Sequence, residues 1–270
     1  MPDNHQPSLG PLIGRGRTAD IYAWEDKRVI KLFHLEWPAE WIDYEYRILK
    51  IINEALLSSP TIGGKAVVDG RTGIIMKRII GDSMLEEIIA KPWRLNALAE
   101  LFANLHVNMH VRQSSQLPWL KEKLRHKIDG VDLLGQSLKD KLLRTLGELP
   151  DDDSICHGDF HPGNIILSPD GPVIIDWVDA SHGNSLADLA RTSLLLRESP
   201  LPAGFNPLKR NILQVIREVF YKEYIQQYSR LKPYSENELW AWMPIVAAAR
   251  LSENIPGESE ILLRIASRDS

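Results

Sequence analysis

Alternating apolar and polar positions dominate the N-terminal third of the chain, and helical spacing dominates the remainder. Ile21–Trp24 and Val29–Phe33 are rich in residues that favour strands, and they flank the turn sequence EDKR. Ala66–Asp69 and Gly73–Met76 flank a second turn at GRT. The pattern therefore predicts three consecutive strands over residues 10–33 and a separate hairpin centred on GRT.

One helix is predicted between these strands, over Trp37–Leu57, with Pro38 in its first turn. Four apolar residues recur on one face of this helix, namely Trp41, Ile48, Ile52 and Ala55. Glu45 falls on the same face, whereas Glu40 and Glu54 fall elsewhere. We therefore expect the Glu45 carboxylate to point into the protein.

From Gly81 onward the spacing is mostly helical. The expected helices cover residues 95–110, two segments within 119–147 separated near DGVD, 185–197, 208–228, 235–254 and 258–267. Ser235 and Glu238 form a capping-box pair, and a short hairpin is expected around SPDG. A β-rich part followed by a helical part predicts an α+β protein of two lobes, residues 1–78 and 79–270, with a cleft between them.

Composition narrows the class of protein further. The chain has 270 residues, of which 44% are hydrophobic and 25% charged, as is usual for soluble globular proteins. A net charge of −4 gives no reason to expect nucleic acid or an anionic membrane as partner. No run of about 18 apolar residues predicts a membrane span. The single cysteine excludes an internal disulfide, and the start MPDNHQPSLG lacks the features of a secretory signal, so we expect a cytoplasmic protein.

The segment ICHGDFHPGNIIL, residues 155–167, contains four residue types that bind zinc: Cys156, His157, Asp159 and His161. Helical zinc motifs place histidines on one face, but here Gly158, Pro162 and Gly163 predict a loop. No second Cys/His cluster lies at ligand spacing. The stretch is therefore better suited to holding a carboxylate and an amide in fixed register, and Cys156 is interpreted as a small packed residue.

A glycine-rich stretch, GRGRTADIY, begins at Gly14. This string also opens dinucleotide-binding βαβ units, but there it runs directly into a helix. Here it runs into the predicted strand Ile21–Trp24, so a hairpin is favoured. Without Cβ atoms, Gly14 and Gly16 would let backbone N–H groups approach phosphate oxygens.

Lys31 lies in the middle of the predicted strand VIKLF, among apolar residues. A lysine in such a position is costly unless its ammonium group has a partner. Glu45 faces inward from the helix that follows. We therefore predict an ion pair between Lys31 and Glu45; the alternative is two separate solvated charges.

Taken in order, the glycine-rich hairpin, Lys31, Glu45, the loop HGDFHPGN and the aspartate of VIIDW resemble the protein-kinase-like fold. They resemble most the form of this fold found in the aminoglycoside phosphotransferase family, and the resemblance covers roughly residues 10–255. The HGDxxxxN pattern of the family matches His157, Gly158, Asp159 and Asn164, and Asp176 of IIDW follows twelve residues later. The resemblance implies a bilobal kinase with a β-rich N-terminal lobe and a mainly helical C-terminal lobe.

The same resemblance implies roles for particular residues, with ATP and Mg²⁺ as cofactors. Asp159 would accept the proton of the attacking hydroxyl, and Asn164 and Asp176 would bind the metal. Lys31 would contact the phosphates. The segment MKRIIG would meet the adenine through Met76, Lys77 and Ile79, and His157 and Asp188 would brace the loop. The roles of His161, Arg15 and Arg17, and the choice of ATP over GTP, remain open.

Only eleven residues separate Asp176 from Asp188, and no APE motif follows, which is too little for a segment that docks a polypeptide. We therefore expect a small-molecule hydroxyl acceptor, bound by residues of 119–147 and 235–254. Trp240 and Trp242 would either line that pocket or belong to the core. From Arg191 to the C-terminus there are 11 Lys/Arg and 9 Asp/Glu, which favours an amino alcohol, a sugar or a similar metabolite over a polycation.

Two alternatives stay open beside this expectation. One is an aminoglycoside resistance kinase, and the other is a nucleotide-binding regulatory protein that keeps the fold without turnover. The sequence leaves the oligomeric state undetermined.

Overall fold

The computed structural model describes residues 9–25, 27–200 and 206–268, and they form two compact units. The sheet unit comprises the chain through Asp82 together with Ile165–Val178. The helical unit comprises Ser83–Asn164 together with the chain from Asp179 onward. The expected α+β fold is confirmed, but the expected boundary at residues 78 and 79 is wrong. The segment from Ile165 returns to the sheet unit because it packs there, and the Ile174 N–H donates to the Ser58 carbonyl at 2.8 Å.

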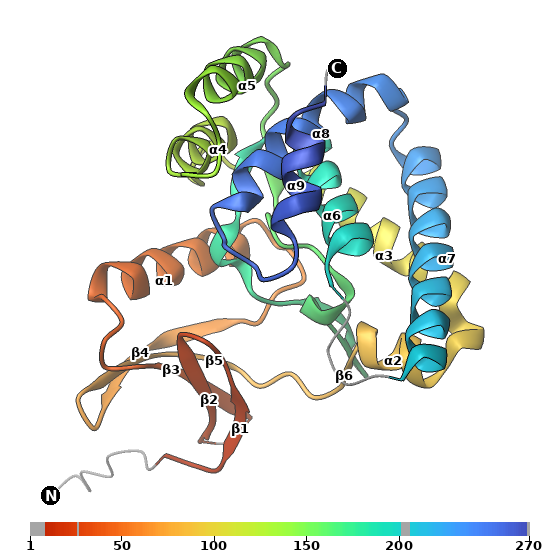
Figure 1. The fold of residues 1–270 in the computed structure, drawn as a ribbon. Coiled ribbons are helices and arrows are strands. Elements are labelled where there is room, and N and C mark those ends of the chain that lie inside the picture. The colour runs from red at the N-terminus through yellow and green to blue at the C-terminus, as the bar shows by residue number, and fades with distance from the viewer. Residues whose placement is uncertain (1–8, 26, 201–205, 269–270) are drawn as a thin grey trace, which may run out of the picture. The chain divides into compact units, whose positions relative to one another are not determined.

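The sheet unit contains a five-stranded antiparallel sheet with the strand order β1-β2-β3-β5-β4 (Figure 1). Its strands are β1 (Leu12–Arg15), β2 (Ala19–Trp24), β3 (Arg28–Phe33), β4 (Ile62–Val68) and β5 (Arg71–Lys77). The three expected N-terminal strands and the hairpin at GRT are confirmed. Asp26 of the EDKR turn lies outside the described residues.

Helix α1 (Ala39–Glu54) packs against β4 and β5 through the stripe that its spacing predicts. Ile48 and Ile52 are fully buried, and Glu45 is 6% exposed. The expectation for Trp41 is wrong, because this side chain is 55% exposed and packs edge-on against Tyr44 on the helix surface. Ile42 is buried in its place.

The hairpin of β8 (Ile165–Ser168) and β9 (Gly171–Ile174) completes the sheet unit. It turns at SPDG, as expected. Gly81 has a structural reason to be glycine in this region. A Cβ atom at Gly81 would overlap the backbone carbonyl of Leu167. The short strand β6 (Asp82–Ser83) lies where the chain passes from one unit to the other.

The helical unit contains the helices expected from the spacing, with ends that differ by a few residues. They are α3 (Leu95–His110), α4 (Leu120–Asp129), α5 (Gln136–Glu148), α6 (Ser185–Glu198), α7 (Pro207–Leu231), α8 (Glu236–Leu251) and α9 (Ser259–Ala266). A further helix, α2 (Met84–Ala90), precedes them and was not among the expected helices. Helix α3 packs against α7, and α8 packs against α4, α6 and α9. The predicted capping box of Ser235 and Glu238 begins α8.

Two short strands lie among these helices. β7 (Ser154–Cys156) pairs antiparallel with β10 (Ser181–Gly183), so the segment before the HGDFHPGN loop and the segment before α6 are neighbours. This pairing places the loop against the first turn of α6. In the described part of the chain, no helix combines the length and the apolar character that a membrane span requires.

Candidate functional site

In the sheet unit, Lys31 forms the predicted ion pair. Its Nζ lies 2.6 Å from Oε1 of Glu45 and 3.9 Å from Oδ1 of Asp176. Burial raises the pKa of Glu45, and the neighbouring Lys31 opposes that shift. The lysine is therefore held between a buried carboxylate and a more exposed one, with 18% of its side chain accessible.

Asp176 follows β9 with a backbone φ of 63°, in the left-handed region that non-glycine residues rarely adopt. Such a conformation costs on the order of 1–3 kcal/mol and persists only where the surroundings impose it. Trp177, which is 1% exposed, anchors the turn by donating from its indole Nε1 to the Ile174 carbonyl at 2.9 Å. The turn leaves the Asp176 side chain 48% exposed, so the carboxylate is accessible to a ligand and not buried in the fold.

The glycine-rich hairpin connects β1 and β2. A Cβ atom at Gly16 would lie 2.9 Å from the Ala19 carbonyl, so this position needs glycine for the turn itself. At Gly14 the nearest atom would lie 4.0 Å away, so the fold alone does not require glycine there. Arg15 and Arg17 are both exposed.

The segment proposed to meet the adenine leaves the end of β5. Met76 pairs with Val29 across the sheet, and the Lys77 N–H donates to the Thr61 carbonyl at 2.8 Å. The next residue donates its N–H to the Lys27 carbonyl, and Ile79 is half-buried. The backbone is thus fixed as far as the residue before Ile79.

In the helical unit, Asp188 braces the HGDFHPGN loop from the first turn of α6. Its carboxylate accepts from the N–H groups of His157 and Gly158, both at 2.8 Å. It also accepts from Nε2 of His106 and of His110, both at 3.2 Å. Burial acts to raise the pKa of Asp188, but the hydrogen bonds from these histidines outweigh burial and hold the pKa well below its usual range.

Both histidines lie on α3 and are fully buried. Burial lowers the pKa of His106 to about 3, so its ring is neutral. Because a carboxylate can only accept, Nε2 of each ring carries the proton. The other ring nitrogen then accepts from a tyrosine hydroxyl of α7, at 2.6 Å for His106 and Tyr224 and 2.7 Å for His110 and Tyr228. The spacing of four residues in each pair was the available sequence signal for this network, and the sequence analysis missed it.

Asp159 lies in the loop that Asp188 holds. The Asn164 amide donates to the Asp159 carbonyl at 3.0 Å and to its Oδ2 at 3.3 Å. Nε2 of His161 lies 3.6 Å from Oδ2, and the Arg191 guanidinium lies 3.7 Å from Oδ1. Burial acts to raise the pKa of Asp159, but His161 and Arg191 outweigh it and lower the pKa below its usual range. The carboxylate is therefore ionised at neutral pH.

His157 and Gly158 hold the loop from inside. Nδ1 of His157 accepts from the Asp159 N–H at 3.2 Å, and the ring is fully buried. Gly158 has a φ of 80°, and a Cβ atom there would lie 2.7 Å from the Asp179 carbonyl. Only glycine fits this position without a shift of the backbone.

The oxygen atoms of Asn164 and Asp176 fit a hard cation such as Mg²⁺. The Asn164 amide nitrogen is engaged with Asp159, which leaves its carbonyl oxygen for a metal. Asp176 offers an exposed carboxylate on a strained turn. The zinc alternative finds no support: burial raises the pKa of the Cys156 thiol well above its usual value, and the loop ligands do not cluster around one point in the described chain.

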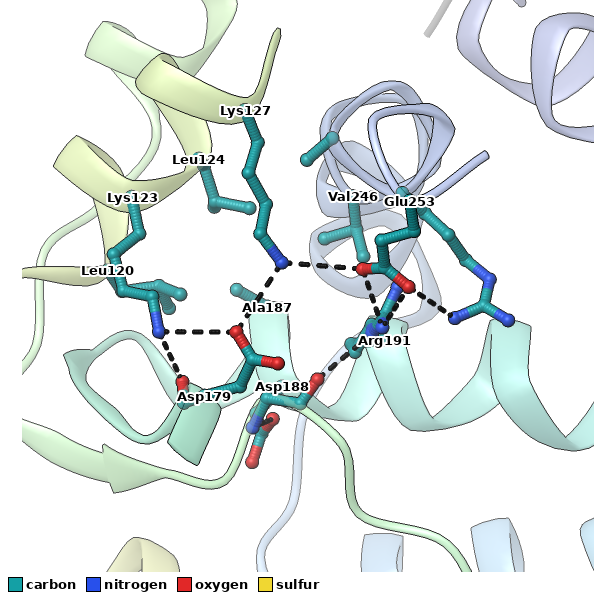
Figure 2. A pocket seen from close by; sticks show the side chains of 13 residues that line it. Leu120, Lys123, Leu124, Lys127, Asp179, Ala187, Asp188, Arg191, Val246 and Glu253 are labelled. Atoms are coloured by element: carbon teal, nitrogen blue, oxygen red, sulfur yellow. Dashed lines mark hydrogen bonds and ion pairs between the residues drawn. The ribbon is translucent and has the colours of Figure 1, made fainter. Parts of the chain in front are cut away.

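A pocket of the helical unit lies beside this loop, between α4, α6 and α8 (Figure 2). Its apolar wall comes from Leu120, Leu124, Ala187, Val246 and Ala249. Trp240 and Trp242 do not line it; Trp242 is core at 1% exposed, and Trp240 is 42% exposed.

The polar side of the pocket is a chain of ion pairs that the sequence analysis missed. Lys123 and Lys127 each lie 3.5 Å from Oδ1 of Asp179. Lys127 lies 3.3 Å from Glu253, and Glu253 lies 2.8 Å from Arg191. Arg191 also donates to the Gly158 carbonyl at 3.0 Å. The pocket therefore connects through one arginine to the loop that carries Asp159.

Comparison with known proteins places the chain. The model of the phosphotransferase enzyme family matches residues 11–234. The structure of aminoglycoside phosphotransferase APH(4)-Ia is similar, with a TM-score of 0.67 and 14% identity over 97% of this chain and 94% of that one. An amicoumacin kinase solved with AMP-PNP, Ca²⁺ and Ami has a TM-score of 0.61 and 12% identity, covering 95% of this chain and 86% of that one.

A third similar structure is aminoglycoside phosphotransferase APH(3'')-Id from Streptomyces rimosus, with a TM-score of 0.59 and 19% identity over 89% of this chain and 92% of that one. No curated protein sequence matches the chain. At these identities the structures show a shared fold, and the expected protein-kinase-like fold is confirmed. Because the family model matches most of its length, the chain belongs to the phosphotransferase enzyme family.

Proposed function

We propose that the protein transfers the γ-phosphate of ATP to a hydroxyl group of a small molecule. The observation that carries this proposal is the state of Asp159: an ionised carboxylate, held in a fixed loop by Asn164, His161 and Arg191. Family membership and similar structures solved with AMP-PNP or ADP support ATP as the donor. We place the reaction in the cytoplasm.

Each unit contributes a separate part of this reaction. In the sheet unit, Lys31 binds the α- and β-phosphates, and Glu45 keeps its ammonium group in place. The glycine-rich hairpin at Gly14 and Gly16 approaches the phosphates, and the chain at Met76, Lys77 and Ile79 meets the adenine. Asp176 offers a carboxylate oxygen and Asn164, in the helical unit, offers an amide oxygen, the ligand types that would hold Mg²⁺; when bound, the ion would neutralise negative charge on the transferred group.

Asp159 orients the acceptor hydroxyl and takes its proton. A carboxylate with a lowered pKa is a weak base, so the proton moves only when the oxygen has begun to bond to phosphorus. Phosphoryl transfer requires positioning and charge stabilisation more than it requires a strong base. The low pKa of Asp159 keeps the acceptor form populated across the physiological range.

Our favoured acceptor is an amino alcohol, a sugar or a similar metabolite. Similar structures favour an antibiotic instead: one was solved with hygromycin B and another with streptomycin. A regulatory protein without turnover is disfavoured, because Lys31, Asp159, Asn164 and Asp176 are all present and their surroundings suit the proposed roles.

The test is transfer from ATP and Mg²⁺ to a panel of amino alcohols, sugars and aminoglycosides, with the product detected by mass. Asp159→Asn keeps the size of the side chain but cannot take the proton, so turnover should fall by about 100-fold or more. Asp140→Asn, an exposed change on α5, is the matched control and should keep full turnover. Near-normal turnover in Asp159→Asn would contradict the role of this carboxylate.

A further inference from the structure

The charged residues that line the pocket of the helical unit limit the charge of the acceptor that can bind there. This inference rests on the proposed function. Two of the charged residues that line this pocket are already neutralised by partners inside the fold. Asp188 is occupied by four N–H donors, and Arg250 contacts the buried Glu258 at 2.5 and 2.7 Å. The charges left to face a ligand are those of Lys123, Lys127, Arg191, Asp179 and Glu253.

Both carboxylates of this set are shared between cations of the chain. Asp179 lies between Lys123 and Lys127, and Glu253 lies against Lys127, Arg191 and Arg250. An ammonium group on a ligand would approach either carboxylate only within reach of these like charges. A polycationic acceptor therefore finds no unshared carboxylate among the residues that line this pocket.

The lysines, by contrast, are only loosely neutralised. Charge-assisted hydrogen bonds between ammonium and carboxylate usually span about 2.7–2.9 Å. The carboxylate contacts of Lys123 and Lys127 measure 3.3–3.5 Å. The one short contact of Lys123, at 2.6 Å, is to the neutral carbonyl of Asp179. Burial and the neighbouring Lys127 both lower the pKa of Lys123, which is consistent with incomplete neutralisation.

The two lysines lie one helical turn apart on α4, and Figure 2 shows both side chains directed towards Asp179. An ammonium group has three donors, so a ligand anion that reaches both lysines beside Asp179 would accept from both. The side chains are 21% and 31% exposed, so they are accessible but partly desolvated. This setting strengthens an anion contact relative to the open surface.

We propose that the acceptor carries an anionic group, a carboxylate or a phosphate, and that Lys127 together with Lys123 binds it and determines acceptor specificity. The acceptor hydroxyl then lies towards Asp159, which Arg191 connects to the same pocket. Kanamycin-like polyamines are excluded by the same two lysines.

The test uses hydroxy compounds in pairs that differ in one anionic group: glycerate and glycerol, gluconate and sorbitol, glucose 6-phosphate and glucose. Kanamycin represents the polycations. Transfer from ATP is measured by mass, and binding is measured by calorimetry with AMP-PNP and Mg²⁺ saturating the nucleotide site. The carboxylate pairs and the phosphate pair distinguish the two forms of the anion.

We expect at least one anionic member to exceed its neutral partner, with Lys127→Met raising its KM or Kd by about 10- to 100-fold, the range for a charge-assisted hydrogen bond. kcat and AMP-PNP affinity should stay close to wild type. Lys127→Arg should recover part of the affinity, and Lys139→Met, on α5, should change nothing.

Better transfer or tighter binding of kanamycin overturns the inference. Anion binding of equal strength in wild type and Lys127→Met also overturns it, and so does the absence of anion binding in both proteins. Lys127-dependent anion binding without transfer to any compound supports the inference and overturns the proposed function instead. Transfer confined to neutral compounds keeps the proposed function and overturns the inference.

Discussion

In the sheet unit, burial raises the pKa of Glu45, whereas in the helical unit Asp188, which is also buried, has a pKa well below its usual range. The difference lies in the partners. Glu45 is held by a single lysine, which also faces Asp176. Asp188 is held by two backbone N–H groups and two neutral histidines, all within 3.2 Å.

This difference separates two ways of placing a charged side chain. One cation leaves Glu45 incompletely compensated, but it keeps Lys31 positioned and partly accessible to a ligand. Several neutral N–H donors compensate the buried charge of Asp188 and fix the backbone of the loop. No cation is part of this arrangement, so it offers no charged group to a ligand. In the sheet unit the buried carboxylate thus holds a cation that stays partly accessible, whereas in the helical unit the buried carboxylate fixes the backbone of a loop.

The largest effect is expected from Asp188→Asn. An amide has one acceptor oxygen and directs its NH₂ group at donors that need an acceptor, so several buried N–H groups lose their partner. We expect a loss of about 3–5 kcal/mol in the free energy of unfolding, the range for breaking a buried charge network. Urea denaturation measures it. A loss below about 1 kcal/mol, as for an exposed change such as Asp140→Asn, would contradict the role given to Asp188.

Removing a tyrosine hydroxyl from the same network should lower the free energy of unfolding by less. Tyr228→Phe removes the hydroxyl that donates to Nδ1 of His110 and leaves that nitrogen buried without a donor. The expected cost is about 1–3 kcal/mol, measured by the same denaturation. Tyr234→Phe is the control, because Tyr234 contacts Tyr228 only ring to ring at 6.0 Å. Equal stabilities of the two variants would show that the hydroxyl of Tyr228 contributes nothing.

The pattern of residues along the chain predicted the pairing of Glu45 with a cation better than it predicted the network of donors around Asp188. Strand alternation put Lys31 in the sheet, and helical spacing put Glu45 on the inner face of α1, so their pairing followed from local periodicity. The same periodicity failed for Trp41, where Ile42 takes the buried position.

Contacts across long stretches of sequence were not predictable in this way. Arg191 meets Glu253 over 62 residues, and Lys127 meets Glu253 over 126. These pairs depend on how α4, α6 and α8 pack, which no single helix encodes. The unit boundary was missed for the same reason, since the β8–β9 hairpin joins the sheet unit through a contact with Ser58.

The smallest effect concerns pH. The raised pKa of Glu45 means that its ionisation costs stability as the pH rises above the ordinary value of 4.5. The lowered pKa of Asp188 acts in the opposite direction: its stabilisation is present above the ordinary value of 3.8 and is lost as the pH falls towards the folded-state pKa.

Glu45→Gln removes the first of these contributions and leaves the second. The stability of the variant should therefore rise more steeply between about pH 4 and 6 than that of the wild type. Urea midpoints over this range give the two slopes. Identical slopes would show that Glu45 has the same pKa in the folded and unfolded chain.

We propose different roles for two carboxylates: Asp176, in the sheet unit, would take part in nucleotide and metal binding, and Asp159, in the helical unit, would take part in transfer. The most direct measurement is the shift in melting temperature on adding ATP, with and without Mg²⁺, because a bound ligand stabilises the folded state by RT ln(1 + [L]/Kd). We predict that Asp176→Ala loses most of the Mg²⁺-dependent shift, whereas Asp159→Asn keeps it. An equal Mg²⁺-dependent shift in wild type and Asp176→Ala would contradict the account.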